Sequence, residues 1–127
     1  MIKLALQETK VVLAEPEGAA LVSGKAFTPH KIQGWTPDFV PKVLNPKVAD
    51  QIVHVSDADA IATARALATR EGIFCGISSG ATFSAALQVA RQAAPGSVIL
   101  AMLPDTGERY LSTVLAEGIN EGSDPEP

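Results

Sequence analysis

Short apolar runs alternate along this chain with longer stretches of helical periodicity. Three of the runs are uninterrupted and rich in aliphatic residues, at 11–14, 51–55 and 97–103. An uninterrupted run is typical of a buried parallel strand, because a strand with one exposed face carries polar residues at every second position. The pattern therefore predicts three buried strands.

The periodic stretches between these runs predict helices. The clearest covers residues 57–71, where Ser56 can cap the first turn and Gly72 can end the last one. A second helix is predicted over 81–93, because its small and apolar residues continue up to a Pro-Gly break. Two shorter helices are predicted over 2–8 and 108–115.

Strands that alternate with helices predict an α/β fold, a three-layer sandwich in which helices cover a mostly parallel sheet. Ligands of such sheets bind beyond the carboxyl ends of the strands. Segment 24–46 is expected to be an ordered loop near that edge, because it holds four prolines yet keeps apolar residues. We expect one α/β domain over residues 1–117 and an acidic, disordered tail over 118–127.

Charge and composition exclude several classes of function. The net charge is −4, and four acids within the last eleven residues account for it, so the body of the domain is nearly neutral. Without a basic stripe, and with 5% aromatic residues, the chain is not expected to bind nucleic acid. No apolar run is long enough to span a membrane. The single cysteine, Cys75, fits a reducing compartment, which predicts a cytoplasmic location.

The stretch that most suggests chemistry is a glycine- and serine-rich turn, GISSG, at 76–80. It could supply a helix N-cap, or it could present N–H groups and hydroxyls to a small polar ligand. It also matches the G-x-S-x-G nucleophile elbow with Ser78 as nucleophile, but His30 and His54 both precede it, which is not the hydrolase order. A phosphate-binding P-loop is disfavoured because no lysine follows the glycines. His54 is interpreted as a core or edge residue, and no metal site is expected.

Three motifs together carry a resemblance to a known family. HKIQG at 30–34, EGIFCGISSGAT at 71–82 and LPDTGERYLST at 103–113 occur in the order and at the spacing found in cysteine synthases. These are O-acetylserine sulfhydrylases, pyridoxal-phosphate enzymes of fold type II. The resemblance covers nearly the whole chain except the acidic tail. It implies the family's reaction, in which acetate leaves O-acetylserine and sulfide adds to give cysteine.

The resemblance implies a cofactor-binding role for three residues. Ser78 matches the partner of the pyridine nitrogen of pyridoxal phosphate, and Pro104 and Asp105 match positions beside the cofactor ring. A neutral hydroxyl near a positive helix end does not hold that nitrogen protonated as an aspartate would. Such a ring suits β-elimination from a substrate with a good leaving group.

Two further pairs of residues receive roles by the same resemblance. Gln33 and Gly34 match the loop that closes over the substrate. His30 and Lys31 match exposed positions implicated in docking serine acetyltransferase. From the bare sequence, Gln33 and Gly34 could simply pack within the loop, and His30 and Lys31 could be parts of a solvated loop.

The family places its Schiff-base lysine, its substrate loop and its phosphate-binding loop upstream of the part that this chain resembles. None of the six lysines stands in the Schiff-base motif. The chain therefore resembles the C-terminal portion of a cysteine synthase, incomplete relative to the full fold, and is expected to be inactive and to bind pyridoxal phosphate unstably by itself. Its expected partners are the missing N-terminal half and a second copy. The alternative hypothesis is a non-catalytic binding module that engages serine acetyltransferase.

Overall fold

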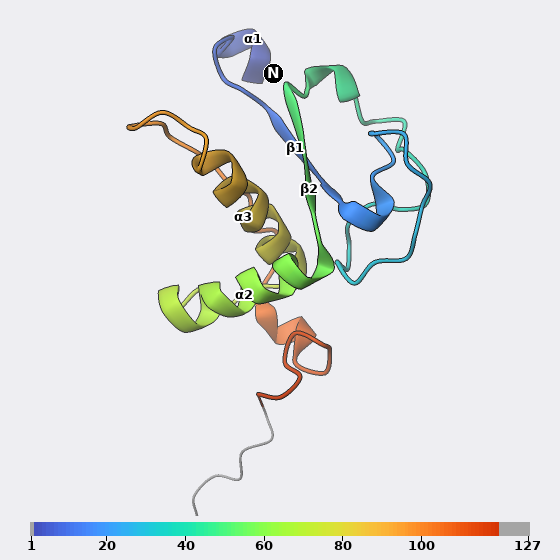
Figure 1. The fold of residues 1–127 in the computed structure, drawn as a ribbon, viewed down its shortest axis with the longest axis vertical. Helices are drawn as coiled ribbons and strands as arrows, with labels where there is room; N and C mark the ends of the chain where they lie inside the picture. The colour runs from blue at the N-terminus through green and yellow to red at the C-terminus, as the bar shows by residue number, and fades with distance from the viewer. Residues whose placement is uncertain (1, 120–127) are drawn as a thin grey trace, which may run out of the picture.

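The structure is a computed structural model that describes residues 2–119, and it has the predicted α/β character (Figure 1). Its elements follow in the order α1 (Ile2–Ala5), β1 (Val12–Pro16), η1 (Glu17–Ala19), η2 (Pro46–Val48), β2 (Gln51–Val55), α2 (Asp57–Glu71), α3 (Ile77–Ala90) and η3 (Gly107–Tyr110). The η elements are 3-10 helices. Nearly all of the predicted acidic tail lies outside the described residues.

Strands β1 and β2 form a parallel pair, as the apolar runs predicted. The register places Val12 opposite Gln51 and Pro16 opposite Val55. In Figure 1 helix α3 lies on one side of this pair, and the irregular loop that follows β1 lies on the other. Val53 and Val55 of β2 are buried in the core, so the strand is covered as its composition indicates.

Helix α2 has the bounds and both caps that the sequence predicts. The Ser56 hydroxyl accepts a hydrogen bond from the backbone N–H of Asp59 at 3.1 Å. Gly72 ends the helix in the left-handed region with φ 69°, a conformation that glycine adopts without steric cost. The prediction of a helix over 57–71 is confirmed.

Helices α2 and α3 cross at their smallest residues and form the centre of the core. A side chain on Gly80 of α3 would meet the backbone carbonyl of Ala60 and the Cβ of Ala64, the latter at 2.7 Å. These three positions therefore set how closely the helices approach. The buried core around them also includes Ile32, Val55 and Tyr110, so loop, sheet and C-terminal turn all pack on the helix pair.

The start of α3 differs from the prediction. The helix begins at Ile77 rather than at 81, with Gly76 in extended conformation at the N-cap position. Ser78 and Ser79 thus lie within the first helical turn, and both are buried. Serine at these positions hydrogen-bonds to neighbouring groups rather than to its own helix end, and this explains why its low intrinsic helix preference misplaced the boundary.

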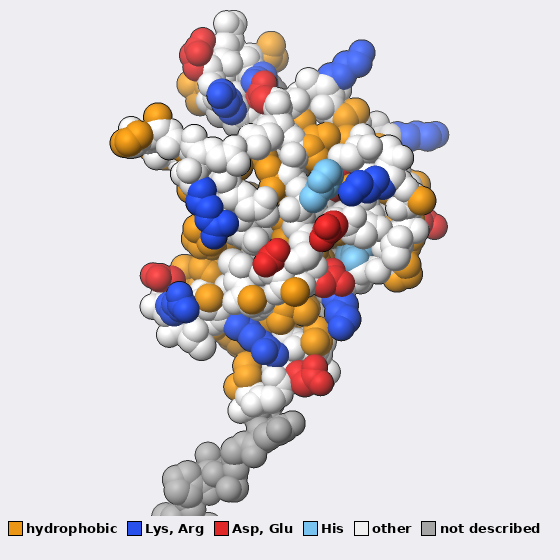
Figure 2. All heavy atoms as spheres, viewed as in Figure 1, with side chains coloured by type: hydrophobic (Ala, Val, Ile, Leu, Met, Phe, Trp, Pro, Cys, Tyr) orange, Lys and Arg blue, Asp and Glu red, His pale blue; other side chains and the backbone are white. Residues whose placement is uncertain are grey.

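The predicted third strand over 97–103 is wrong for the part of the chain that the structure describes. Neither a helix nor a strand forms over this segment, and no strand in residues 2–119 pairs with it. Val98 and Leu100 are 97% and 94% exposed, and Figure 2 shows hydrophobic side chains on the surface of the projection that follows α3. A strand needs a neighbour for its backbone N–H and C=O groups, and the described residues supply none here.

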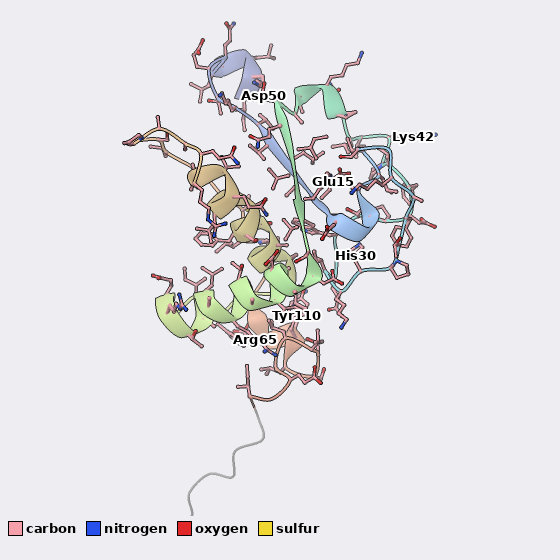
Figure 3. All side chains as sticks on the ribbon, in the orientation of Figure 1. Glu15, His30, Lys42, Asp50, Arg65 and Tyr110 are labelled. Atoms are coloured by element: carbon pink, nitrogen blue, oxygen red, sulfur yellow. The ribbon has the colours of Figure 1, made fainter. Side chains whose placement is uncertain are left out.

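The predicted helix over 108–115 is also wrong, because only the short η3 turn forms at its start. The guanidinium of Arg65 on α2 explains the rest. It donates hydrogen bonds to the backbone carbonyls of Val114, Leu115 and Glu117, each at 2.9 Å. Figure 3 shows Arg65 on the side of α2 along which the C-terminal segment runs. The carbonyls of Leu115 and Glu117 bond to Arg65, and that of Val114 bonds both to Arg65 and, at 3.4 Å, to the N–H of Glu117 in a tight turn, so the segment is held by Arg65 in turns rather than in a continuous α-helix.

Replacing Arg65 by methionine is expected to release this C-terminal segment from α2. Methionine keeps most of the side-chain volume but loses three charge-assisted hydrogen bonds, so the free energy of unfolding should fall by about 1.5–3 kcal/mol. Urea denaturation and limited proteolysis after residue 110 measure the effect. Arg70→Met removes the same charge from an exposed position on α2 and serves as the control. Equal stability of the two variants would contradict the anchoring role.

The loop over 24–46 is irregular up to η2 and is anchored to the domain, as predicted. Ile32 is fully buried in the core. The backbone N–H of Lys31 donates to the carboxylate of Asp57 at 2.9 Å, which fixes the loop at the start of α2. The helix predicted over 2–8 is reduced to α1. Among residues 2–119, no helix combines the length and the apolar character that crossing a membrane requires.

Candidate functional site

The carboxylate of Asp105 joins the two motifs that suggested a functional site. Its Oδ1 lies 3.4 Å from Ser78 Oγ, and its Oδ2 accepts a hydrogen bond from the hydroxyl of Tyr110. The backbone carbonyl of Asp105 accepts a further hydrogen bond from Ser79 Oγ at 3.3 Å. Tyr110 and both serines are buried, and Asp105 is half-buried, so the hydroxyls are shielded from solvent while the Asp105 side of the cluster is partly accessible. Figure 3 shows Tyr110, the last residue of η3, beneath α2.

Backbone contacts bring the two motifs together. Cys75 and Thr106 form an isolated antiparallel bridge, in which the N–H of Gly76 donates to Asp105 O at 3.3 Å and the N–H of Gly107 donates to Phe74 O at 3.2 Å. A Cβ atom on Gly76 would overlap the side chains of Asp105 and Tyr110. Glycine is therefore required at this position, because it lets the carboxylate and the phenol pack directly against the backbone.

The electrostatics of the cluster follow from the Asp105 carboxylate and from burial. The hydrogen bond to Asp105 and, secondarily, burial raise the pKa of Tyr110 to about 12, and the nearby Arg109 opposes this. Burial and the charge of Asp105 also raise the pKa of the Cys75 thiol, while a hydrogen bond with Ser79 lowers it. Tyr110 therefore stays a proton donor at neutral pH, and Cys75 stays a neutral thiol rather than a reactive thiolate.

Two alternative interpretations of the GISSG stretch fail on this geometry. Gly76, not a serine, occupies the N-cap position, and no side chain caps the helix. Ser78 is the second residue of α3, and its hydroxyl bonds to Asp105 rather than to a histidine. An elbow nucleophile needs an imidazole within hydrogen-bond reach as its general base, and none contacts Ser78 within residues 2–119. The hydroxyls instead lie at the positive end of a helix of fourteen residues.

The other predicted site residues are not drawn into this cluster. Gln33 and Gly34 are exposed, and nothing in the described range 2–119 hydrogen-bonds them to Ser78 or Asp105. Pro104 is exposed beside Asp105. The structure therefore brings Ser78 and Asp105 into one compact group, whereas the loop of Gln33 and Gly34, which the sequence expected near the same edge, makes no hydrogen bond to that group within residues 2–119. The roles assigned to all of these residues stay predictions.

The two residues predicted to dock a partner differ in their accessibility. The side chain of Lys31 is exposed, whereas His30 is half-buried, in the position labelled in Figure 3. The ring of His30 packs edge-on against Phe27 and its Nε2 lies 3.4 Å from the carbonyl of Thr36. His30 thus braces its own loop, and Lys31 is the more accessible member of the pair.

A second polar cluster, which the sequence did not predict, holds β1 and β2 to the start of the loop. Glu15 is 3% exposed, and its carboxylate accepts hydrogen bonds from Val22 N and Ser23 Oγ, both at 2.7 Å. His54 Nε2 lies 3.0 Å from Ser23 Oγ and 3.7 Å from Glu15. Serine and acid contact the same ring nitrogen, so the group cannot relay a proton as a catalytic triad does. The one sequence feature that could have indicated this cluster is Glu15, a glutamate within the otherwise apolar strand β1.

A polar cleft of about 580 Å³ lies next to this second cluster, between the end of β2 and α3, and His54 and Ser84 contribute to its lining. Neither Ser78 nor Asp105 lines it. No group of three or more histidine, cysteine, aspartate or glutamate side chains within residues 2–119 is arranged to hold a metal ion. The Ser78–Asp105–Tyr110 cluster is therefore the candidate site that sequence and geometry share.

Known proteins of similar sequence match most of this chain. The family model described as "Pyridoxal-phosphate dependent enzyme" matches residues 1–105. O-ureido-L-serine synthase of Streptomyces lavendulae is 52% identical over 124 residues, which are 98% of this chain and 38% of that protein. A probable cysteine synthase of Bacillus subtilis is 44% identical over 114 residues, 90% of this chain and 37% of that protein.

Solved structures show the same relationship. The crystal structure of O-ureido-L-serine synthase matches with a TM-score of 0.93 at 52% sequence identity. The match covers 98% of this chain and 39% of the chain in that crystal structure. The crystal structure of cysteine synthase from Entamoeba histolytica matches with a TM-score of 0.87 at 38% sequence identity, and the match covers 96% of this chain and 36% of that one. The chain thus spans less than two fifths of these relatives, and the resemblance to cysteine synthases that its motifs predicted is confirmed. This chain belongs to the family of pyridoxal-phosphate dependent enzymes.

Proposed function

We propose that this chain is the part of a cysteine synthase-like enzyme that contacts the pyridine ring of pyridoxal phosphate, with Ser78 as the partner of the ring nitrogen. The observation that carries the proposal is the Ser78 hydroxyl itself. It is buried in the first turn of α3, it is held by Asp105, and it lies within a motif shared with cysteine synthases. A single hydroxyl at a helix N-terminus can form one hydrogen bond with the single nitrogen of a pyridine ring.

The residues of the cluster fit this group chemically. When bound, pyridoxal phosphate supplies the electron sink that labilises the bonds at the substrate's α- and β-carbons. Ser78 orients the ring through its nitrogen, and the positive end of α3 lies close to the same edge. Pro104 and Asp105 flank the ring in this proposal. Gln33 and Gly34 would close over the substrate and exclude water from it.

The names of the relatives suggest the class of reaction. Cysteine and O-ureido-L-serine share the serine skeleton and differ in the group on the β-carbon. We therefore propose a β-substitution, in which the leaving group of an activated serine, acetate in the cysteine synthase case, is replaced by an incoming nucleophile. Sulfide gives cysteine, and an oxygen nucleophile gives an O-substituted serine. The alternative of a module that binds serine acetyltransferase stays a prediction that no contact of the structure favours.

The proposal requires parts that the chain's own motifs do not include, namely a Schiff-base lysine and a phosphate-binding loop. We propose that the remainder of a longer protein supplies them, and that it adds strands beside the largely exposed segment 97–103. Val98, Leu100 and Met102 alternate along that segment as its most exposed side chains. The backbone N–H and C=O groups of such a segment can pair with another strand. We also propose that a second copy associates with this chain through the same apolar surface.

A chimeric enzyme tests the proposal. The matching segment of Streptomyces lavendulae O-ureido-L-serine synthase is replaced by this chain, which the structural agreement makes feasible. We expect the chimera to retain pyridoxal phosphate through dialysis and to convert O-acetylserine with sulfide into cysteine. Ser78→Ala in the chimera should lower turnover by roughly tenfold or more, because one hydrogen bond to the ring is lost, with the cofactor retained.

The control variant for this experiment is Asp38→Asn, which removes a carboxylate from an exposed loop position. Its turnover should equal that of the unmodified chimera. A folded chimera that retains the cofactor but forms no product would contradict the proposed reaction. Unchanged turnover and an unchanged cofactor spectrum in Ser78→Ala would contradict the role of Ser78.

A further inference from the structure

The polar cleft of about 580 Å³ opens where helices α2 and α3 diverge. The helices are in close contact at Gly80, where an added Cβ atom would meet Ala60 and Ala64. Figure 1 shows them separating beyond this crossing, with the strand pair beside α3. Neither Ser78 nor Asp105 lines the cleft, so it is distinct from the candidate site.

The cleft contains a hydroxyl group without a hydrogen-bond partner. Ser84, one helical turn beyond Gly80, lines the cleft and is 8% exposed. Its Oγ makes no hydrogen bond to another group in residues 2–119 and is not fully enclosed, so it opens onto the cleft. A largely buried hydroxyl without a partner is costly, and a polar group bound in the cleft would supply that partner.

Gln88, one further turn along α3, adds an oriented amide to the same wall. Its Nε2 donates to the backbone carbonyl of His54 at 3.2 Å, which fixes the direction of the side chain. Its Oε1 then remains an acceptor for a group in the cleft. Ser84 and Gln88 together therefore suit a ligand that carries amide groups.

A cation marks one end of the cleft. Arg91 follows the last residue of α3 and lines the cleft, and no ion pair within the described residues includes its guanidinium. Seven residues separate it from Ser84, and at 1.5 Å per residue they place the two about 10 Å apart along the helix. An arginine fork of this kind matches the geometry of a carboxylate.

Two acids mark the other end, at the crossing of the helices. Asp59 directly precedes Ala60, the residue that would meet a Cβ atom on Gly80. Glu17 directly follows β1, whose last residue pairs with the last residue of β2 just before α2 begins. Both acids line the cleft. They would repel a plain anion, whereas Arg91 would repel a plain cation.

We propose that this cleft binds an extended amphoteric molecule, an amino-acid derivative with its carboxylate and its ammonium group about 10 Å apart. The carboxylate lies at Arg91 and the ammonium group at Asp59 and Glu17, with amide groups between them at Ser84 and Gln88. A tripeptide in extended conformation has this length, about 10 Å. The inference does not depend on the proposed function, because the two sites share no residue.

Triglycine and three relatives test this inference on the 127-residue chain. Triglycine carries both charges, N-acetyltriglycine lacks the ammonium group, triglycinamide lacks the carboxylate, and glycine holds its two charges too close together. Each is titrated while the backbone amide signals of Ser84, Gln88 and Gln92 are followed by NMR. We expect triglycine to reach half-saturation at a concentration roughly threefold to tenfold lower than each of the others, the value of one charge-assisted hydrogen bond at a partly exposed site.

Variants of the charged residues assign the two ends. Arg91→Met should remove the advantage of triglycine over triglycinamide, whereas Arg70→Met, also exposed but outside the cleft, should keep it. Asp59→Asn combined with Glu17→Gln should remove the advantage over N-acetyltriglycine. These side chains are exposed, so the variants are expected to fold.

Equal binding of the four probes would overturn the inference, as would a folded chain in which no probe shifts these amides. An Arg91→Met chain that still prefers triglycine over triglycinamide would overturn it as well. None of these results would affect the role proposed for Ser78, which the turnover of the chimera tests separately.

Discussion

Replacement of Ser78 by aspartate is expected to lower the free energy of unfolding of this chain by about 3 kcal/mol, the order of cost of an uncompensated buried charge. Ser78 is 5% exposed, and its Oγ lies 3.4 Å from the carboxylate of Asp105. A second carboxylate at that position would face the first one in a site with little water. The positive end of α3 offsets only part of this repulsion.

The pH dependence of this loss identifies its cause. Burial and the charge of Asp105 should raise the pKa of the introduced carboxyl above its value in the unfolded chain. The folded state then binds the proton more tightly, so the loss is fully present above the folded-state pKa and shrinks as the pH falls through it. Urea denaturation of the unmodified chain and of the variant, at neutral and at acidic pH, measures the loss of unfolding free energy at each pH.

The matched control is Ser78→Asn, which has nearly the same size as aspartate and no charge. Its loss of unfolding free energy should be about 1 kcal/mol, typical of a single substitution, and should not vary with pH as the aspartate variant does. If aspartate and asparagine cost the same at neutral pH, Ser78 does not face the Asp105 carboxylate.

Replacement of Gly80 by alanine is expected to destabilise the chain by roughly 1–3 kcal/mol, the typical cost of overpacking. On helix propensity alone the change should stabilise by about 1 kcal/mol, because Gly80 lies inside α3 and alanine is the better helix former. The new Cβ, however, would meet the carbonyl of Ala60 and the Cβ of Ala64. A backbone carbonyl in α2 cannot move without displacing that helix.

Gly18→Ala is the control for this prediction. A Cβ at Gly18 meets its nearest neighbour, Thr28, at 3.8 Å, which is an ordinary van der Waals contact. Its unfolding free energy should change by less than about 0.5 kcal/mol. Thermal and urea denaturation compare the two variants, and a Gly80→Ala chain more stable than the unmodified one would show that the helices are not in close contact at this crossing.

Local signals were sufficient for the part of the fold centred on β2 and α2. Ser56 and Gly72 act on backbone groups within a few residues of themselves, so the bounds of α2 could be predicted from the sequence. The apolar composition of 51–55 likewise predicted β2 with its observed bounds. The start of α3 was missed because Ser78 and Ser79 bond to Asp105, far away in the sequence, rather than acting as caps.

The candidate site was predictable only in its components. The resemblance of the motifs predicted that Ser78 and Asp105 lie beside a cofactor ring, but their mutual contact and the contribution of Tyr110 depend on the bridge between Cys75 and Thr106. The cluster of Glu15, Ser23 and His54 left no recognisable pattern, because its members come from three separate segments.

The sequence by itself determined the α/β class, strand β2, helix α2 and the family, since each of these depends on local periodicity, capping or motif order. Only the tertiary structure decided that segment 97–103 is largely exposed and pairs with no strand in residues 2–119, and that Arg65 binds carbonyls of the C-terminal segment. It also decided that a carboxylate stands behind Ser78. The physical reason is the same for all three: strand pairing, buried hydrogen bonds and electrostatic contacts depend on which groups meet in space, and the partner is set by packing rather than by neighbouring residues.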